Sequence, residues 1–176
     1  MIAPTLTTDR LSIEPMSRAH WEDYAAAWTD PRMTEFIVGE PRSRNVSWGK
    51  MLQGIGLWSL FGYGYWSFVE RESGRFVGNG GLAQFERGIP ELADFPEAGW
   101  AFAPDAWGKG YATEAMAAIF DWADAHALGE IRCIIDTGNV ASHNVAGKLG
   151  FVKFAESRDV IGDLFIYRRE SRVSQR

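Results

Sequence analysis

The stretch from Trp107 to Ala115 reads WGKGYATEA and places two glycines and a lysine directly before an Ala-rich helical pattern. A Gly inside a helix costs about 1 kcal/mol relative to Ala, so helix formation alone does not explain these residues. A helix N-terminus exposes unpaired N–H groups and carries roughly half a positive charge. Gly108 and Gly110 would let an anion approach those groups, and Lys109 would add charge at the rim. The spacing fits a turn that wraps a phosphate or diphosphate, and it fits a strand-to-helix turn without a ligand equally well.

Two other phosphate-binding motifs do not match this stretch. The Walker motif requires Gly-Lys followed by Ser or Thr, whereas Lys109 is followed by Gly110. The dinucleotide-binding motif G-x-G-x-x-G requires a third Gly at the position of Thr113. The stretch therefore fits neither of these two motifs.

The other reactive side chains do not form a recognisable site. Cys133 is the one cysteine, and it alternates with Ile131 and Ile135, which predicts buried packing and excludes an internal disulfide. The three histidines, at positions 20, 126 and 143, lack the spacing of metal ligands. No metal is expected.

Composition and charge narrow the class of protein. With 176 residues and a 46% hydrophobic share, the chain predicts one domain, residues 1–170, followed by a frayed tail, 171–176. A net charge of −5, with no basic cluster beyond Arg168 and Arg169, argues against a nucleic-acid partner. The N-terminus lacks the pattern of a signal peptide, and no apolar run approaches the ~18 residues that span a membrane. A soluble cytoplasmic protein without a membrane partner is expected.

Hydrophobic periodicity predicts alternating strands and helices. Expected helices cover residues 17–30, 45–60, 110–127 and 141–149; expected strands cover 5–15, 63–71, 75–86, 97–104, 131–136 and two segments on either side of 161–163. In the second helix, the helical spacing is carried by Trp48, Met51, Leu52, Ile55 and Trp58. Because helices separate the later strands, an α/β fold with a mixed sheet and helices on both faces is expected.

A second segment, Asn139 to Phe151 (NVASHNVAGKLGF), completes a pattern that the glycine turn begins. Together they resemble the GNAT superfamily of acyl-CoA-dependent N-acyltransferases, whose diphosphate loop R/Q-x-x-G-x-G/A aligns with Trp107 to Ala112. Further similarity extends over TDRLSIEPM, SGRFVGNGGL and EAGWAFAP, and therefore over nearly the whole chain. The closest resemblance is to the branch typified by ribosomal-protein alanine N-acetyltransferases.

This resemblance implies a mostly antiparallel sheet of six to seven strands and acetyl-CoA as co-substrate. The residues that it places at the cofactor are Phe102, Trp107, Gly108, Lys109, Gly110, Tyr111, Ala112, Thr113, Asn139, Ser142 and Asn144. A backbone amide near Phe102 would polarise the thioester carbonyl if the strands splay as in the family. Two positions depart from the pattern: Trp107 stands at the R/Q position, and Ala146 stands where many members carry a Tyr that protonates the thiolate.

Glu97 is the expected general base, because it enters the strand before the cofactor loop, where this branch often carries a carboxylate. Strand alternation places Glu97, Gly99 and Ala101 on one face, and the small residues would leave room for an acceptor. The alternative role for Glu97 is a solvated or salt-bridged carboxylate, and Glu91 is a competing base. Ser142 is the expected substitute for the missing Tyr, with a helix N-cap as its alternative role.

The resemblance also suggests where the acceptor binds and what the protein does. The strand that contains Tyr65 and the loop that contains Phe36 would border the acceptor groove. The expected function is acetyl transfer from acetyl-CoA to a primary amine, on a protein N-terminus or a small molecule. The alternatives are a catalytically silent CoA-binding module and a phosphate- or nucleotide-binding domain. Monomer and homodimer are both open.

Overall fold

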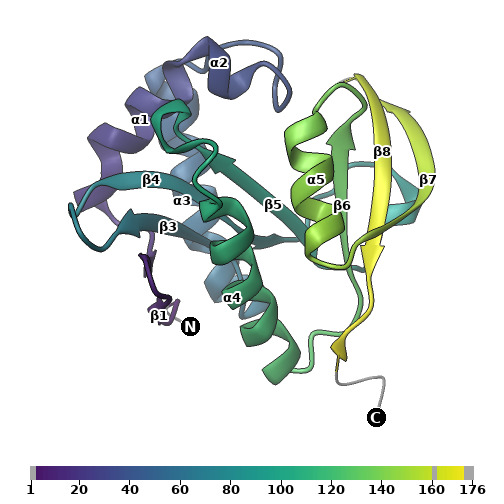
Figure 1. The fold of residues 1–176 in the computed structure, drawn as a ribbon. Helices are drawn as coiled ribbons and strands as arrows, with labels where there is room; N and C mark the ends of the chain where they lie inside the picture. Colours follow the sequence, from purple (N-terminus) through teal and green to yellow (C-terminus); the bar gives the residue numbers. More distant parts are fainter. Residues whose placement is uncertain (1–2, 160–161, 173–176) are drawn as a thin grey trace.

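The computed structural model describes residues 3–159 and 162–172. Within these residues, one eight-stranded sheet with the order β1-β2-β3-β4-β5-β6-β8-β7 crosses the molecule, and helices lie on both of its faces (Figure 1). All neighbouring strands are antiparallel except β5 and β6, so the expected fold class is confirmed.

The expected strand count of six to seven is too low because the first predicted strand is two strands. β1 (Leu6–Thr7) and β2 (Leu11–Pro15) pair with each other across a tight turn. The Thr8 hydroxyl accepts from the Leu11 N–H at 3.0 Å, and the Thr8 N–H donates to the Leu11 carbonyl at 2.9 Å. These local bonds reverse the chain inside a run that alternates like one continuous strand.

The middle of the sheet follows the predicted strands closely. β3 (Tyr65–Glu70) and β4 (Phe76–Ala83) form a hairpin that turns at Gly74, and β5 (Glu97–Phe102) pairs with β4. β6 (Ile131–Asp136) lies between β5 and β8 (Gly162–Arg169), and β7 (Val152–Asp159) forms the edge. The expected turn at 161–163 lies partly outside the described residues.

β5 and β6 pair at one register position, Glu97 with Arg132, and then diverge (Figure 1). Because parallel strands end at the same edge of a sheet, the helices that follow them begin at that edge. These helices are α4 (Tyr111–Ala125), which follows the short 3₁₀ turn Pro104–Ala106, and α5 (Val140–Lys148). The opening between the strands therefore faces two helix N-termini.

Two apolar clusters hold helices to the two faces of the sheet. Met116 and Ile119 of α4 and Ala146 of α5 belong to the larger cluster, which contains Phe68 and Trp66 of β3. The second cluster joins α1 (Trp21–Thr29), α2 (Pro31–Thr34) and α3 (Arg44–Phe61) to the opposite face. Short 3₁₀ turns at Arg18–His20 and Pro90–Leu92 complete the connections.

The expected helix is confirmed as α3, but its buried face includes only part of the apolar residues that recur at helical spacing. The buried residues are Ser47, Met51, Gly54, Leu57 and Trp58, whereas Trp48, Leu52 and Ile55 are exposed. The helix packs through Gly54, where an added Cβ would come within 2.9 Å of the Met16 sulfur and 3.3 Å of the Tyr65 Cβ. Close approach at a glycine, rather than the largest side chains, decides which face is buried.

The ordered chain continues beyond the expected end of the domain. Ser171 is buried and forms a hydrogen bond with Asp124, and Arg172 forms an ion pair with Asp121 at 3.2 Å. These two residues of the expected tail are therefore anchored, and 173–176 lie outside the described residues. In the part of the chain that the structure describes, no helix is both long and apolar enough to cross a membrane.

Candidate active site

The loop between β5 and α4 requires its glycines for backbone conformation. Gly108 and Gly110 have φ of +73° and +81°, which L-residues with a side chain rarely adopt. Residues 107–110 are exposed. Among the described residues, no atom accepts a hydrogen bond from the backbone N–H groups of Gly108 to Thr113. The loop therefore presents a run of free N–H donors, which suits a diphosphate.

The β1–β2 turn holds this loop in place from outside the sheet. The Arg10 guanidinium contacts the Glu114 carboxylate at 2.6 Å and donates to the Lys109 carbonyl at 2.8 Å. The Thr8 hydroxyl also donates to Glu114, at 2.6 Å. Burial raises the pKa of Glu114, but the hydrogen bonds from Thr8 and Arg10 outweigh it and hold the pKa below its usual value. The sequence patterns gave no sign of this clamp, because its partners lie about 100 positions apart.

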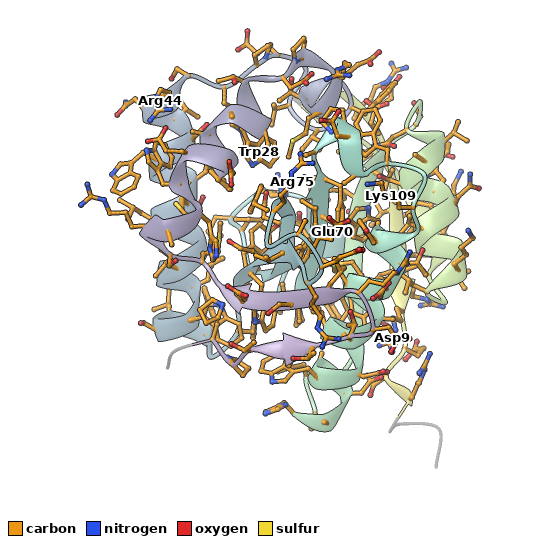
Figure 2. The ribbon with its side chains drawn as sticks, turned by 60° about the vertical axis from the view of Figure 1, so that its left-hand side comes forward. Asp9, Trp28, Arg44, Glu70, Arg75 and Lys109 are labelled. Carbon is orange, nitrogen blue, oxygen red and sulfur yellow. The ribbon has the colours of Figure 1, made fainter. Side chains whose placement is uncertain are left out.

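Two side chains of the loop serve its own structure. The Trp107 indole N–H donates to the Phe102 carbonyl at 2.7 Å and joins the loop to the end of β5. The Tyr111 hydroxyl donates to Glu70, which raises the pKa of Tyr111 and, with Ser73, lowers that of Glu70. Glu70 and Lys109 are labelled near each other in Figure 2. Tyr111 therefore has only its backbone N–H to offer a ligand.

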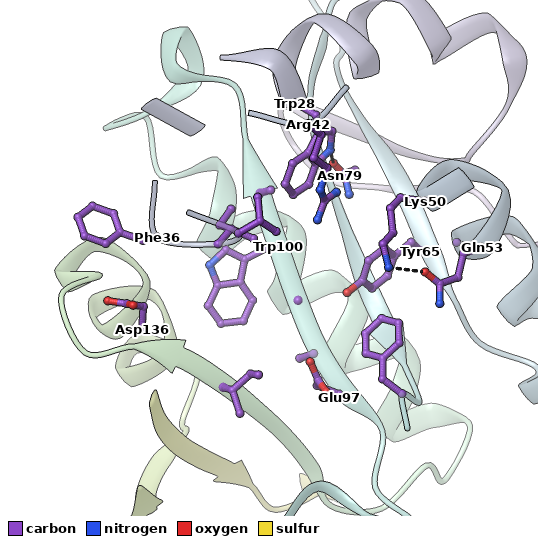
Figure 3. A pocket seen from close by; sticks show the side chains of 18 of the residues that line it. Trp28, Phe36, Arg42, Lys50, Gln53, Tyr65, Asn79, Glu97, Trp100 and Asp136 are labelled. Atoms are coloured by element: carbon purple, nitrogen blue, oxygen red, sulfur yellow. Dashed lines mark hydrogen bonds between the residues drawn. The ribbon is translucent and has the colours of Figure 1, made fainter. Parts of the chain in front are cut away.

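A cavity of about 1000 Å³ occupies the region where β5 and β6 diverge (Figure 3). Its wall contains the candidate catalytic residues, Glu97 and Ser142, and the candidate acceptor residues, Tyr65 and Phe36. Asn139 lines it as well, whereas loop residues 107–113 do not. The loop is instead at the end of β5, one strand length from Glu97. The expected residues thus form one cavity and an adjoining donor loop.

Glu97 forms an ion pair with Arg87, which matches the salt-bridged carboxylate that was the alternative to the expected general base. Its side chain is 7% exposed, and Arg87 contacts its two oxygens at 2.7 and 2.8 Å. Ala83 pairs with Glu97, so the segment that follows Ala83 passes close to this carboxylate. A correct prediction of this strand register would have pointed to Arg87 as the partner of Glu97. The competing base, Glu91, does not line the cavity; its carbonyl accepts from Arg132.

The Tyr65 side chain occupies the space beside Gly99 that was expected to receive the acceptor. A Cβ at Gly99 would lie 2.5 Å from the Tyr65 hydroxyl, so only glycine allows this contact. Burial, followed by the nearby Glu97 charge, raises the pKa of Tyr65, which therefore stays a neutral hydroxyl in the cavity wall. The expectation that small residues leave room for an acceptor at Gly99 is corrected accordingly.

The start of α5 separates the roles of Asn139 and Ser142. Asn139 is the N-cap, because its Oδ1 accepts from the Ser142 N–H at 3.0 Å. Ser142, expected as the alternative N-cap, instead keeps its hydroxyl free of any described partner and lines the cavity. Asn144 is exposed and lies outside the cavity wall. Ala146 is buried, and its methyl side chain offers no hydroxyl.

Backbone donors also face the opening between the strands. The Ala103 N–H donates to Val77 of the β4 side, so alternation turns the N–H groups of Trp100 and Phe102 towards β6. β6 has already diverged at these positions. These donors are therefore placed to polarise a carbonyl that enters the gap, as the sequence analysis expected near Phe102.

Comparison with known proteins identifies the family. The family model described as the acetyltransferase (GNAT) domain matches residues 10–152. This chain belongs to the GNAT acetyltransferase family. As a member it is an N-acetyltransferase, and the family uses acetyl-CoA and transfers its acetyl group to amines.

Proteins similar to this GNAT acetyltransferase cover most of its length. The Bacillus subtilis (strain 168) uncharacterized protein YkkB is 27% identical over 175 residues, covering 94% of this chain and 95% of that protein. A putative GNAT-family acetyltransferase from Bordetella pertussis has a TM-score of 0.84 at 26% identity, covering 95% of this chain and 99% of that one. The ribosomal-protein-S5-alanine acetyltransferase from Vibrio fischeri has a TM-score of 0.76 at 18% identity, over 97% and 98%, which is a likeness of fold.

Proposed function

We propose that this protein transfers the acetyl group of acetyl-CoA to a primary amine bound in the cavity, by direct attack on the thioester. The observation that supports this most is the cavity between β5 and β6, because its wall contains both Glu97 and Ser142. A donor loop with free backbone N–H groups adjoins it at the end of β5. The cavity and the adjoining loop together would offer an anion site, carbonyl donors and two side chains for proton transfer.

The donors of the chain fit acetyl-CoA in order along its length. The N–H groups of Gly108 to Thr113 would bind the diphosphate, with Lys109 at the rim. The N–H groups of Trp100 and Phe102 would donate to the thioester oxygen, where negative charge develops. Asn139 has used its Oδ1 to cap α5, so its side-chain NH₂ is what remains for the pantetheine arm or the acceptor.

The attacking amine must first lose a proton. At pH 7 this costs about 4.6 kcal/mol for a lysine ε-amine with a pKa of ~10.4, and only about 1 kcal/mol for an α-amine with a pKa of ~7.7. Glu97 would accept the proton, directly or through a water molecule, while Arg87 holds the carboxylate in position. As the new C–N bond forms, the C–S bond breaks, and the nitrogen loses its surplus proton. A proton ends on the departing sulfur, whose negative charge the Ser142 hydroxyl would stabilise by donating a hydrogen bond, so the products are the amide and the free CoA thiol.

The experiment is acetyl-CoA turnover with a panel of amines, measured by release of the free thiol. The expected result is a rate above background that depends on the amine. No rate with any amine, together with tight CoA binding, would instead indicate a CoA-binding module without catalysis. This alternative is considered because Ala146 stands where many family members carry the Tyr that protonates the thiolate. ADP binding as tight as CoA binding would indicate a nucleotide-binding domain.

A further inference from the structure

One wall of the cavity contains an arginine that has no acidic partner among the residues that the structure describes. Arg42 precedes α3 and packs its guanidinium 3.6 Å from the centroid of the Trp28 ring. Its side-chain hydrogen bond goes to the neutral hydroxyl of Tyr24, and no carboxylate contributes to the lowering of its pKa by burial. Stacking on Trp28 fixes the planar guanidinium and leaves its edge for a ligand.

A buried side-chain amide near Arg42 has an NH₂ group whose hydrogen-bond donors are not used by the described residues. Asn79 is 3% exposed and lines the cavity. Its Oδ1 accepts from the Trp28 indole N–H at 3.1 Å. Because an indole N–H can only donate, this bond determines the orientation of the amide and leaves its NH₂ group on the other side. Among the described residues, no atom accepts from that NH₂ group.

A third donor comes from α3. Lys50 is exposed but lines the same cavity, and its ammonium donates to the neutral Gln53 side chain at 3.1 Å. Burial, and then the charges of Arg42 and Arg87, lower the pKa of Lys50. Arg87 is offset by Glu97, whereas no ion pair offsets Arg42 or Lys50 within the described residues.

The acidic residues of the cavity wall either have other partners or are exposed. Glu97 is paired with Arg87, and Asp136 accepts from the Gly138 N–H at 2.8 Å. Glu40 and Glu86 are exposed. Figure 3 shows Arg42 and Asn79 together towards one end of the cavity, Glu97 towards the other end and Tyr65 between them.

We infer that the acceptor carries an anionic oxygen group, a carboxylate or a phosphonate-like group, in addition to its amine, and that Arg42, Asn79 and Lys50 bind that group. This inference rests on the proposed function. A guanidinium edge, an amide NH₂ and an ammonium are all donors, and together they match the oxygens of such a group. The amine then extends towards Glu97. The acceptor class is therefore an amino acid or a similar zwitterion, and not a polyamine, whose cations Arg42 and Lys50 would repel.

Binding of matched amines to the CoA-saturated protein tests this inference independently of turnover. Calorimetry would compare three compounds in each of two sets: phenylalanine, its aminophosphonic analogue and 2-phenylethylamine; then 4-aminobutanoate, 3-aminopropylphosphonate and butylamine. Spermidine is measured alongside them as a polyamine that carries no anionic group. In at least one set the acid or the phosphonate should bind about 10- to 100-fold more tightly than the plain amine, as expected for charge-assisted hydrogen bonds. Which of the two binds more tightly identifies the anionic group.

Two variants and a matched control test whether the preference for anionic compounds over plain amines depends on Arg42 and Asn79. Arg42→Gln should remove most of it, and Asn79→Asp should remove it while keeping the acceptor for Trp28. Arg44→Gln is the control, because Arg44 also lies over a tryptophan, Trp21, but is exposed, paired with Glu22 and outside the cavity wall. All three variants should bind CoA as the wild type does.

Three results would overturn the inference: equal binding of acids and plain amines, no binding of either, or a preference that survives Arg42→Gln and Asn79→Asp. Failure of the proposed function looks different. It would be an absence of acetyl transfer while the anion preference persists in binding.

Discussion

A carboxylate introduced at Gly108 tests whether the β5–α4 loop binds a diphosphate. A Cβ at Gly108 would have no heavy atom within 4 Å, so a side chain there points into open space. At Gly110 a Cβ would lie 3.5 Å from the Arg10 guanidinium. An Asp at that position would pair with Arg10 and compete with Glu114 for it. Gly108→Asp is therefore the cleaner perturbation.

The expected effects on stability and on binding differ in size. A side chain in the left-handed region costs about 1 kcal/mol, and an acidic group near the start of α4 recovers about half of that. A unit charge about 6 Å from a doubly charged diphosphate, at an effective dielectric constant of about 60, opposes binding by about 2 kcal/mol. The dissociation constant of acetyl-CoA should therefore rise roughly 30-fold while the fold stays intact.

Two controls separate charge from backbone strain and from position. Gly108→Asn has nearly the same shape as Gly108→Asp and tolerates the same backbone conformation, but it adds no charge. Gly129→Asp adds the charge beyond the other end of α4, where φ is +76° and a Cβ would also meet nothing within 4 Å. Calorimetry with CoA should give dissociation constants for both controls within about threefold of the wild type. The loss in Gly108→Asp should shrink in ~1 M salt, where the Debye length is only about 3 Å.

The reasoning is refuted if Gly108→Asp binds CoA as tightly as Gly108→Asn does. It is also refuted if Gly129→Asp loses as much affinity as Gly108→Asp, because the effect would then not depend on the donor loop.

Three further substitutions test other parts of the site. Glu97→Gln should lower turnover about 100-fold or more with little change in CoA affinity; an unchanged pH–rate profile would remove Glu97 as the base. Glu114→Gln should lower the free energy of unfolding by about 1–2 kcal/mol at pH 7. Since the folded-state pKa of Glu114 is lowered, denaturant titrations should show this difference fading as the pH falls through that pKa, and a difference that persists in acid contradicts the clamp. Ser142→Ala should lower turnover about tenfold yet change stability by less than about 0.5 kcal/mol, because Asn139 is the N-cap; a large loss of stability with normal turnover would show a structural role.

Features that depend on neighbouring residues were predicted well from the sequence. The short gap between the expected strands 63–71 and 75–86, the end of the expected helix 141–149 and the glycine turn all coincide with residues at positive φ, namely Gly74, Gly150, Gly108 and Gly110. Glycine is favoured there by local steric exclusion, which involves only adjacent peptide units. Alternation likewise identified the faces of β5, because successive side chains of any strand point to opposite sides.

The first strand and the packing of α3 show where local patterns fail. The run around Leu6 and Leu11 alternates like one strand, yet hydrogen bonds of Thr8 reverse it. α3 carries large apolar residues on several sides, so its period does not define a buried face, and the fit of Gly54 against Met16 decides it.

For the active site, the sequence by itself determined the donor loop and, through the resemblance, the family, because the turn and its glycines are contiguous. Only the tertiary structure decided which side chains share the cavity: Arg87 with Glu97, Arg42 with Trp28, and Trp28 with Asn79, 51 positions away. It also decided that Arg10 positions the loop from the far end of the chain. Such pairs arise from strand order and helix packing, which bring together residues whose separation along the chain carries no period and no motif.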